Sequence, residues 1–141
     1  MTDKQINVYL IISLGSIGKR HLFNLRQLDN QAKIIVLRHQ KTNTSIDDKN
    51  VIEVSSMQDA LDLNPTVAII ASPAVFHVEQ ALILLNHNIH LFIEKPLAHN
   101  LNSVEKLQRL AEEKSLMVMV FSLPNSVLTS LTFFLGSIIQ I

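Results

Sequence analysis

A glycine-rich stretch near the N-terminus has the residue types and the spacing to hold a phosphate group. It covers residues 13–18 (SLGSIG) and directly follows a run of apolar residues. Backbone amides at the start of a helix, together with the positive end of the helix dipole, suit the pyrophosphate of a dinucleotide. The complete G-x-G-x-x-G pattern would have glycine at position 13, where this chain has Ser13. If that position requires a glycine-type backbone, the serine costs on the order of 1–3 kcal/mol.

The other two glycines of the pattern, Gly15 and Gly18, are present. Gly15 would let the backbone approach the phosphates, and Gly18 would let the following helix pack closely against the strand. Ser16 could donate its hydroxyl to a phosphate or cap the helix, and its residue type does not decide between these roles. Glycines that serve close packing alone are the alternative interpretation of the whole stretch.

About twenty residues past the glycines, an NAD-selective domain normally carries an acidic residue that binds the ribose hydroxyls. This chain has Arg38 at that place, followed by His39. An arginine there can pair with a 2′-phosphate or stack on the adenine, which favours NADP modestly and leaves NAD open. The alternative is an arginine that simply reaches solvent at the end of a strand.

Two more groups of polar residues follow predicted strands. Pro73, after Ser72, turns the chain away from the sheet, in a loop that would lie beside the nicotinamide end of a bound cofactor. We predict that His77, at the start of the next helix, is a hydrogen-bonded structural or cofactor-lining group rather than a proton carrier. Glu94 and Lys95 emerge from a buried strand, so either both reach solvent or Lys95 projects into a ligand crevice.

Apolar segments of two kinds alternate along the chain and would bring these residues to one edge. Strand, helix and strand in such regular alternation predict right-handed crossovers and a parallel sheet. The fold class is therefore α/β, a doubly wound, Rossmann-like parallel sheet of six strands with helices on both faces, whose ligands bind at the carboxyl ends of the strands. The strands are predicted at residues 6–12, 33–37, 51–54, 66–71, 89–93 and 116–121, and the helices from Ser16 to about Leu28, from the cap Ser56 through Leu63, over Val75–Leu85 and from the cap Asn102 through Ala111.

The composition excludes several function classes. The 141 residues include 12 Lys and Arg and 12 Asp and Glu, and the net charge of zero argues against binding to nucleic acid or to an anionic membrane. The absence of cysteine fits a reducing compartment, so we expect a cytoplasmic location, and we predict no metal site. From Ser115 to Ile141 no residue is charged, but polar residues interrupt the segment and make a membrane anchor an unfavoured interpretation. We expect self-association through this tail.

The ordered set of motifs resembles the N-terminal domain of the Gfo/Idh/MocA family of NAD(P)-dependent oxidoreductases. The motifs are residues 15–21 (GSIGKRH), Ser72 and Pro73 with His77, and residues 94–98 (EKPLA), and the resemblance covers about residues 5–122. It implies that the turn of Ser13, Gly15, Ser16, Ile17 and Gly18 lines the pyrophosphate of NADP or NAD, that Arg38 lies by the adenosine ribose, and that Ser72, Pro73 and His77 flank the nicotinamide.

The resemblance also implies a catalytic residue. Lys95 would contact the nicotinamide ribose and the reacting hydroxyl, and its charge would stabilise a developing alkoxide, while Glu94 and Pro96 would shape its loop. Residues 1–122 would be the NAD(P)-binding domain, and 123–141 would be an apolar tail that begins a truncated substrate domain.

The function implied is hydride transfer between a nicotinamide cofactor and a hydroxyl of a sugar or nucleotide-sugar. The substrate domain of the family does not fit into the remaining residues, so we expect a chain that is incomplete as an enzyme on its own, and a separate chain could carry the missing part. The alternative is a non-catalytic remnant or interaction module that keeps the α/β fold without using a cofactor.

Overall fold

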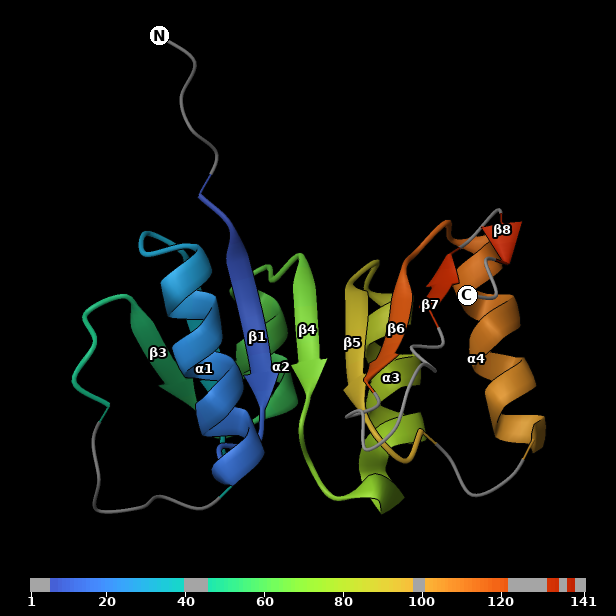
Figure 1. Ribbon diagram of the computed structural model, residues 1–141, viewed down its shortest axis with the longest axis horizontal. Coiled ribbons are helices and arrows are strands. Elements are labelled where there is room, and N and C mark those ends of the chain that lie inside the picture. The colour runs from blue at the N-terminus through green and yellow to red at the C-terminus, as the bar shows by residue number, and fades with distance from the viewer. Residues whose placement is uncertain (1–5, 40–45, 98–100, 122–131, 135–136, 139–141) are drawn as a thin grey trace, which may run out of the picture.

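One mixed sheet is the centre of the molecule. The computed structural model describes residues 6–39, 46–97, 101–121, 132–134 and 137–138, and within them the strand order is β3-β2-β1-β4-β5-β6-β7-β8 (Figure 1). β1 to β6 are mutually parallel, as predicted, and β7 and β8 extend the β6 edge in antiparallel pairing. The strands are β1 (Val8–Ile12), β2 (Lys33–Leu37), β3 (Val51–Val54), β4 (Val67–Ile70), β5 (His90–Glu94), β6 (Val118–Phe121), β7 (Thr132–Phe134) and β8 (Ser137–Ile138).

The helices lie on both faces of the sheet, which confirms the predicted fold class. α1 crosses one face, and α2, α3 and α4 lie on the other (Figure 1). The helices are α1 (Ser16–Leu28), α2 (Met57–Asp62), α3 (His77–Asn86) and α4 (Leu101–Glu113), and a short 3-10 turn, η1 (Ala74–Phe76), precedes α3. In the described part of the chain, no helix is both long enough and apolar enough to cross a membrane.

β1 is buried on both faces because its residues alternate between two hydrophobic clusters. Leu10 belongs to the cluster that includes residues of α2, α3 and α4, whereas Ile11 belongs to the cluster that includes Leu22 and Leu25 of α1, and both strand residues are fully buried. A run of apolar residues without polar alternation is typical of such a central strand. The central position predicted for the first strand is therefore confirmed.

The register of the central strands places their carboxyl ends at one level. Ile12 of β1 is paired with Leu37 of β2 on one side and with Ile70 of β4 on the other. Ser13 and Arg38 consequently leave the sheet side by side, and the loop after β4 begins at the same edge. This edge is where an open α/β sheet binds its ligands.

The two predicted helix caps have different outcomes. The Ser56 hydroxyl oxygen accepts a hydrogen bond from the Asp59 amide at 3.1 Å, so Ser56 caps α2 as predicted. The cap predicted at Asn102 is wrong, because α4 already begins at Leu101 and Asn102 lies inside its first turn. Apart from β7 and β8, the predicted tail 123–141 lies outside the described residues.

Candidate cofactor site at the carboxyl edge of the sheet

A cavity of about 520 Å³ opens where the chain leaves β1, β2 and β4. Its volume lies within the range of small-molecule sites, and it lies at the point where the connections from β1 and β4 diverge. The cavity brings together several predicted site residues, namely Ser13, Gly15, Arg38, Ser72 and Pro73. It is also lined by residues that sequence reasoning did not assign to the site: Ile12, Leu14, Leu37, His39, Phe76 and Gln80.

Ser13 has the backbone conformation that the glycine motif requires. Its φ is 75°, in the left-handed region, and its amide donates a hydrogen bond of 2.9 Å to the Leu37 carbonyl. A non-glycine residue in this region costs on the order of 1–3 kcal/mol. The turn therefore has the same backbone shape that a glycine would give it. The unfavourable free energy of this conformation remains in the folded chain as backbone strain at Ser13.

Gly15 and Gly18 differ in what surrounds them. A Cβ at Gly18, which is buried in α1, would overlap the carbonyl oxygen of Ser13. A Cβ at Gly15 would have no protein atom within 4 Å. Packing within the protein therefore requires glycine at 18 only, whereas the space beside Gly15 is left open toward the cavity. This opening fits a group that approaches the backbone from outside, as a pyrophosphate does.

The first turn of α1 begins without a side-chain cap. Gly15 is the N-cap residue, and no side chain accepts a hydrogen bond there, in contrast to Ser56 at the start of α2. Ser16 is the first residue of the helix and is exposed, so the capping role considered for it is wrong. The first amides of a helix have no partner within the helix, so they can donate to an external acceptor.

Arg38 does not extend freely into solvent. Its guanidinium Nη2 donates to Oε2 of Glu53 on β3, and the Arg38 side chain is only 12% exposed. Its amide donates to the Val54 carbonyl at 3.0 Å, which continues the pairing of β2 with β3. The alternative of a solvated arginine is therefore wrong, and Arg38 lines the cavity as one half of an ion pair.

The wall opposite the glycine turn comes from β4 and the segment after it. The Ser72 hydroxyl donates to Oε1 of Gln80 at 2.6 Å, so α3 holds this side chain in place. Phe76 is 48% exposed and also lines the cavity. Phe76 and Gln80 are four residues apart and thus share a helical face, which is the signal that could have identified them from sequence.

His77 connects two loops and does not line the cavity. Its side chain is 1% exposed, with Nε2 at 2.7 Å from the Ser72 carbonyl oxygen and Nδ1 at 2.9 Å from the Pro96 carbonyl oxygen. Both partners are acceptors, so a neutral imidazole, with one N–H, donates to one of them, and an imidazolium donates to both. The ring thereby joins the loop after β4 to the loop after β5.

The Glu94-Lys95-Pro96 segment begins at the last residue of β5 and lies outside the 520 Å³ cavity. Glu94 does not reach solvent with Lys95: its side chain is 14% exposed, and its Oε1 is 2.6 Å from Nε2 of His21 on α1. Lys95 and Pro96 are exposed, and the peptide bond between them is cis. The His21 ring packs edge-on against Phe92, with 5.4 Å between the ring centroids. His21 belongs to the GSIGKRH motif, but nothing in the sequence indicated its pairing with Glu94.

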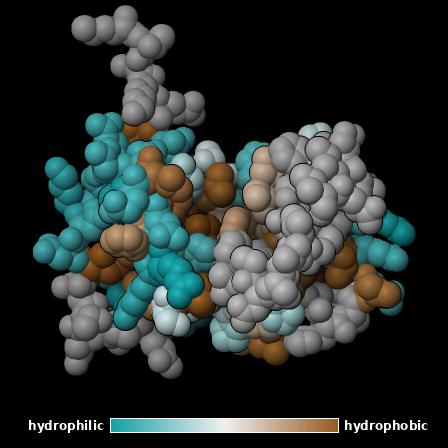
Figure 2. Space-filling model, in the orientation of Figure 1, coloured by the Kyte–Doolittle hydropathy of each residue, from teal (hydrophilic) through white to brown (hydrophobic). Residues whose placement is uncertain are grey.

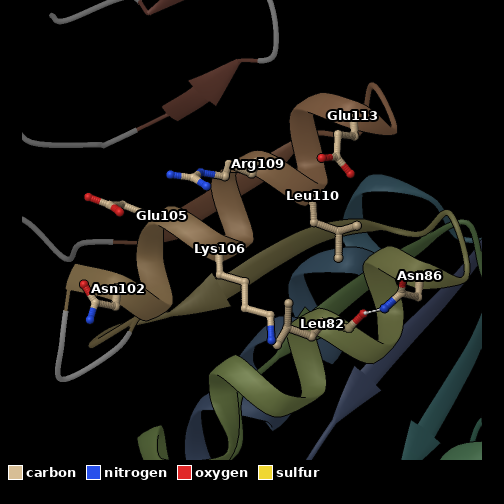
Figure 3. Close-up of a pocket in the computed structure, with 8 residues that line it drawn as sticks. All are labelled: Leu82, Asn86, Asn102, Glu105, Lys106, Arg109, Leu110 and Glu113. Atoms are coloured by element: carbon tan, nitrogen blue, oxygen red, sulfur yellow. Dashed lines mark hydrogen bonds between the residues drawn. The ribbon is translucent and has the colours of Figure 1, made fainter.

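Further hollows lie elsewhere on the molecule. A groove of about 390 Å³, whose residues include Ile17, His21, Phe92 and Glu94, lies beside α1, where hydrophobic residues are visible next to its hydrophilic outer side (Figure 2). A third hollow, of about 640 Å³, lies between α3 and α4, with Glu105 and Arg109 directed away from α3 (Figure 3). It contains none of the predicted site residues. Within the described ranges, no three His, Asp or Glu side chains are grouped to hold a metal ion.

Comparison with known proteins identifies the cofactor class. The Gfo/Idh/MocA family model, described as an oxidoreductase family with an NAD-binding Rossmann fold, matches residues 8–122. The match covers the glycine turn, the cavity and the segment after β5. It confirms the resemblance drawn from the motifs and the prediction of a nicotinamide dinucleotide as cofactor.

Two relatives and one solved structure illustrate the similarity. The chain is 25% identical over 113 residues to the 4-carboxy-2-hydroxymuconate-6-semialdehyde dehydrogenase of Sphingobium sp. (strain NBRC 103272 / SYK-6), covering 75% of this chain and 35% of that protein. It is 38% identical over 50 residues to the NADP(+)-dependent scyllo-inositol 2-dehydrogenase IolU of Bacillus subtilis (strain 168), covering 36% of this chain and 15% of that protein. The WlbA dehydrogenase of Bordetella pertussis, solved with NADH and UDP-GlcNAcA, is 19% identical with a TM-score of 0.72, covering 83% of this chain and 38% of that chain. The chain thus spans well under half the length of these proteins.

Proposed function

The chain belongs to the oxidoreductase family with an NAD-binding Rossmann fold, and from this premise we propose that it is the cofactor-binding part of a sugar or nucleotide-sugar oxidoreductase. When bound, the nicotinamide would exchange a hydride with the carbon that bears the reacting hydroxyl. The scyllo-inositol dehydrogenase relative and the nucleotide-sugar complex of the structural neighbour support this substrate class.

The open space at Gly15, beside the uncapped start of α1, is the observation that carries the proposal. The amides of Ser16, Ile17 and Gly18 would donate to the pyrophosphate, and the hydroxyl of Ser16 is exposed and able to add a further donor. The left-handed backbone at Ser13 keeps the turn in the required shape.

The residues around the turn would orient the rest of the cofactor. Arg38 would lie beside the adenosine ribose, and Ser72 and Pro73 would flank the nicotinamide side, where Gln80 holds the serine hydroxyl. His77 would act through the loops, because it joins the carbonyls of Ser72 and Pro96.

Lys95 is the residue that we propose to contact the substrate. It is exposed immediately after β5, and the contact of Glu94 with His21 fixes the residue before it. An ammonium group at this place would stabilise negative charge that develops on the reacting oxygen. Glu94 and Pro96 would shape the loop that presents it.

The remaining parts of the proposal concern regions that the described residues do not include. We place the domain boundary near residue 122, where the family match ends. The groups that recognise the substrate would come from a further domain or a separate chain, and the apolar tail would support self-association. The expected cytoplasmic location also stays a prediction.

Calorimetric titration of the 141-residue chain with NAD and with NADP tests the proposal. We expect measurable binding of at least one nucleotide, which Gly15→Val weakens by about tenfold or more, equivalent to about 1.4 kcal/mol, because the new side chain fills the space that the phosphates need. Lys95→Ala should weaken binding less, since Lys95 lies outside the cavity. Glu105→Gln, an exposed position on α4, is the control and should leave binding unchanged.

Absence of binding of both nucleotides at millimolar concentration would contradict the proposal. It would favour the alternative of a non-catalytic interaction module that keeps the fold, for which the strained serine at position 13 is the motivating observation.

A further inference from the structure

The ion pair between Arg38 and Glu53 lies at the end of β2, where the proposed function puts the adenosine ribose and hence the 2′ group in which NAD and NADP differ. Arg38 is the first residue after β2 and lines the cavity, and Glu53 lies on the neighbouring strand β3. Glu53 is paired with Val36, two residues before Arg38, so the two charged side chains lie on the same face of the sheet as diagonal neighbours. The pair is therefore set by strand register and is not an accident of two long side chains on a surface.

The Glu53 carboxylate is held from two sides. Its Oε2 accepts from the Arg38 guanidinium, and its Oε1 accepts from the Ile46 amide at 3.4 Å. The Glu53 side chain is 35% exposed, and it reaches the cavity through Arg38, which lines it, rather than by lining the cavity itself. A ligand that approaches the Arg38 guanidinium from the cavity therefore meets a group that is already paired with a carboxylate.

NAD and NADP respond differently to this arrangement. The 2′-phosphate of NADP is a dianion, which Arg38 attracts and Glu53 repels, and Glu53 already neutralises much of the charge of Arg38. The 2′-hydroxyl of NAD is neutral and can donate a hydrogen bond to a carboxylate. We propose that Glu53 is a specificity-determining residue of the cofactor site and that, through its pair with Arg38, the site selects NAD over NADP.

This inference rests on the proposed function and reverses the modest preference for NADP that Arg38 alone suggested. An acidic residue is missing from the end of β2, where NAD-selective domains normally carry it, and here the neighbouring strand supplies the carboxylate. Sequence position alone does not identify such a residue, because it comes from a different strand.

Binding of four nucleotides to the full chain at one fixed ionic strength tests the inference. The probes are NAD, NADP, AMP and adenosine 2′,5′-bisphosphate, so that each pair differs only by the 2′-phosphate. We expect wild-type protein to bind NAD and AMP about tenfold more tightly than their phosphorylated counterparts, equivalent to about 1.4 kcal/mol. This comparison requires no variant.

The isosteric variant Glu53→Gln removes the charge and keeps the shape of the side chain. We expect it to tighten binding of NADP and of the bisphosphate by about tenfold and to weaken binding of NAD and AMP by about twofold to fivefold, because the 2′-hydroxyl then donates to a neutral amide oxygen instead of a carboxylate. Adding Arg38→Ala to Glu53→Gln should abolish this gain. Glu105→Gln removes one negative charge on α4 and should leave the selectivity as in wild type. Circular dichroism melts verify that each variant is folded.

Two results would overturn the inference while leaving the proposed function intact: wild-type protein that binds NADP as tightly as NAD, or a folded Glu53→Gln variant with unchanged selectivity. Failure of the proposed function has a different signature, since neither nucleotide would then bind to wild type or to Glu105→Gln. In that case both the proposed function and the inference about Glu53 would be wrong.

Discussion

Gly15 and Gly18 occupy one turn, three residues apart, and the structure places opposite demands on them. The backbone of Ser13 crowds Gly18, and Gly15 faces open space. The sequence pattern names both glycines but does not tell a packing glycine from a binding glycine. The distinction leads to different consequences for the same substitution.

We expect Gly18→Ala to lower the free energy of unfolding by about 1–3 kcal/mol or more, because its methyl group would overlap the Ser13 carbonyl oxygen. Gly15→Ala should change that free energy by less than about 0.5 kcal/mol and should instead weaken NAD binding. Urea denaturation and nucleotide titration of both variants measure the two effects. Equal destabilisation by both substitutions would contradict the open space at Gly15.

At Ser13 we expect a substitution to stabilise the protein instead of destabilising it. Its left-handed backbone, with φ 75°, costs about 1–2 kcal/mol for an L-residue, and glycine removes that cost while adding about 0.5–1 kcal/mol of unfolded-state entropy. Ser13→Gly should therefore raise the free energy of unfolding by on the order of 0.5–1 kcal/mol. Ser16→Gly, in the first turn of α1, is the control and should not be stabilising. Urea denaturation midpoints of the two variants test this prediction. A lower midpoint for Ser13→Gly than for wild type would contradict the claim that the backbone at Ser13 is strained.

At the scale of elements, His77 joins loops that follow two different strands. The side chain starts α3, yet both of its ring nitrogens contact carbonyl oxygens, one after β4 and one after β5. The arrangement makes the positions of the two loops interdependent. It also explains why a histidine at the start of a helix is almost completely buried.

Replacing His77 with Phe keeps a ring of similar size and leaves the carbonyls of Ser72 and Pro96 without this partner. A neutral imidazole donates to one of the two carbonyls, and an unsatisfied carbonyl costs about 1–3 kcal/mol, so we expect a loss of about 1–3 kcal/mol in the free energy of unfolding. His87→Phe is the matched control, because His87 is exposed at the end of α3 and its hydrogen bond to the Ile83 carbonyl lies in solvent. Similar losses in the two variants, measured by urea denaturation, would exclude the joining role of His77.

Elements formed by local patterns could be predicted well from sequence. The ranges predicted for β2, β3 and α1 agree with the structure to the residue, because apolar runs and helical spacing are properties of neighbouring residues. The pair of Asn102 and Glu105 also resembled a capping box, but the same spacing occurs inside a helix, where the structure has it. A short pattern cannot distinguish these positions.

Contacts between distant segments could not be predicted in this way. The pairing of Arg38 with Glu53 depends on the register of β2 against β3, and the contact of His21 with Glu94 spans 73 positions in the sequence. No spacing rule connects such residues. The site is therefore recognisable by its motifs, whereas its electrostatics become apparent only in the folded chain.

For the whole molecule, the cavity gathers residues from two halves of the sheet. The segments after β1 and β2 supply Ser13, Gly15 and Arg38, and the loop after β4 and helix α3 supply Ser72 and Gln80. A ligand that contacts both halves should stabilise the chain as a unit, because it binds the folded state only.

We therefore expect NAD at tenfold its dissociation constant to add about 1.4 kcal/mol to the free energy of unfolding, which raises the melting temperature by several degrees for a chain of this size. Thermal melts followed by circular dichroism measure this shift. Gly15→Val, with binding weakened about tenfold or more, should gain at most about 0.4 kcal/mol at the same NAD concentration and therefore shift much less. An equal shift in this variant would mean that the nucleotide binds outside the cavity.

The strand order also sets when the site can exist during synthesis. β4 begins at Val67, so a chain that has left the ribosome only as far as Asn64 carries the strands β1, β2 and β3 with the glycine turn, but not the wall that Ser72, Phe76 and Gln80 provide. The nascent first half of the chain therefore contains only one wall of the cavity. Cofactor cannot guide its folding until translation has passed α3, and the early strands must hold their register on their own hydrophobic contacts.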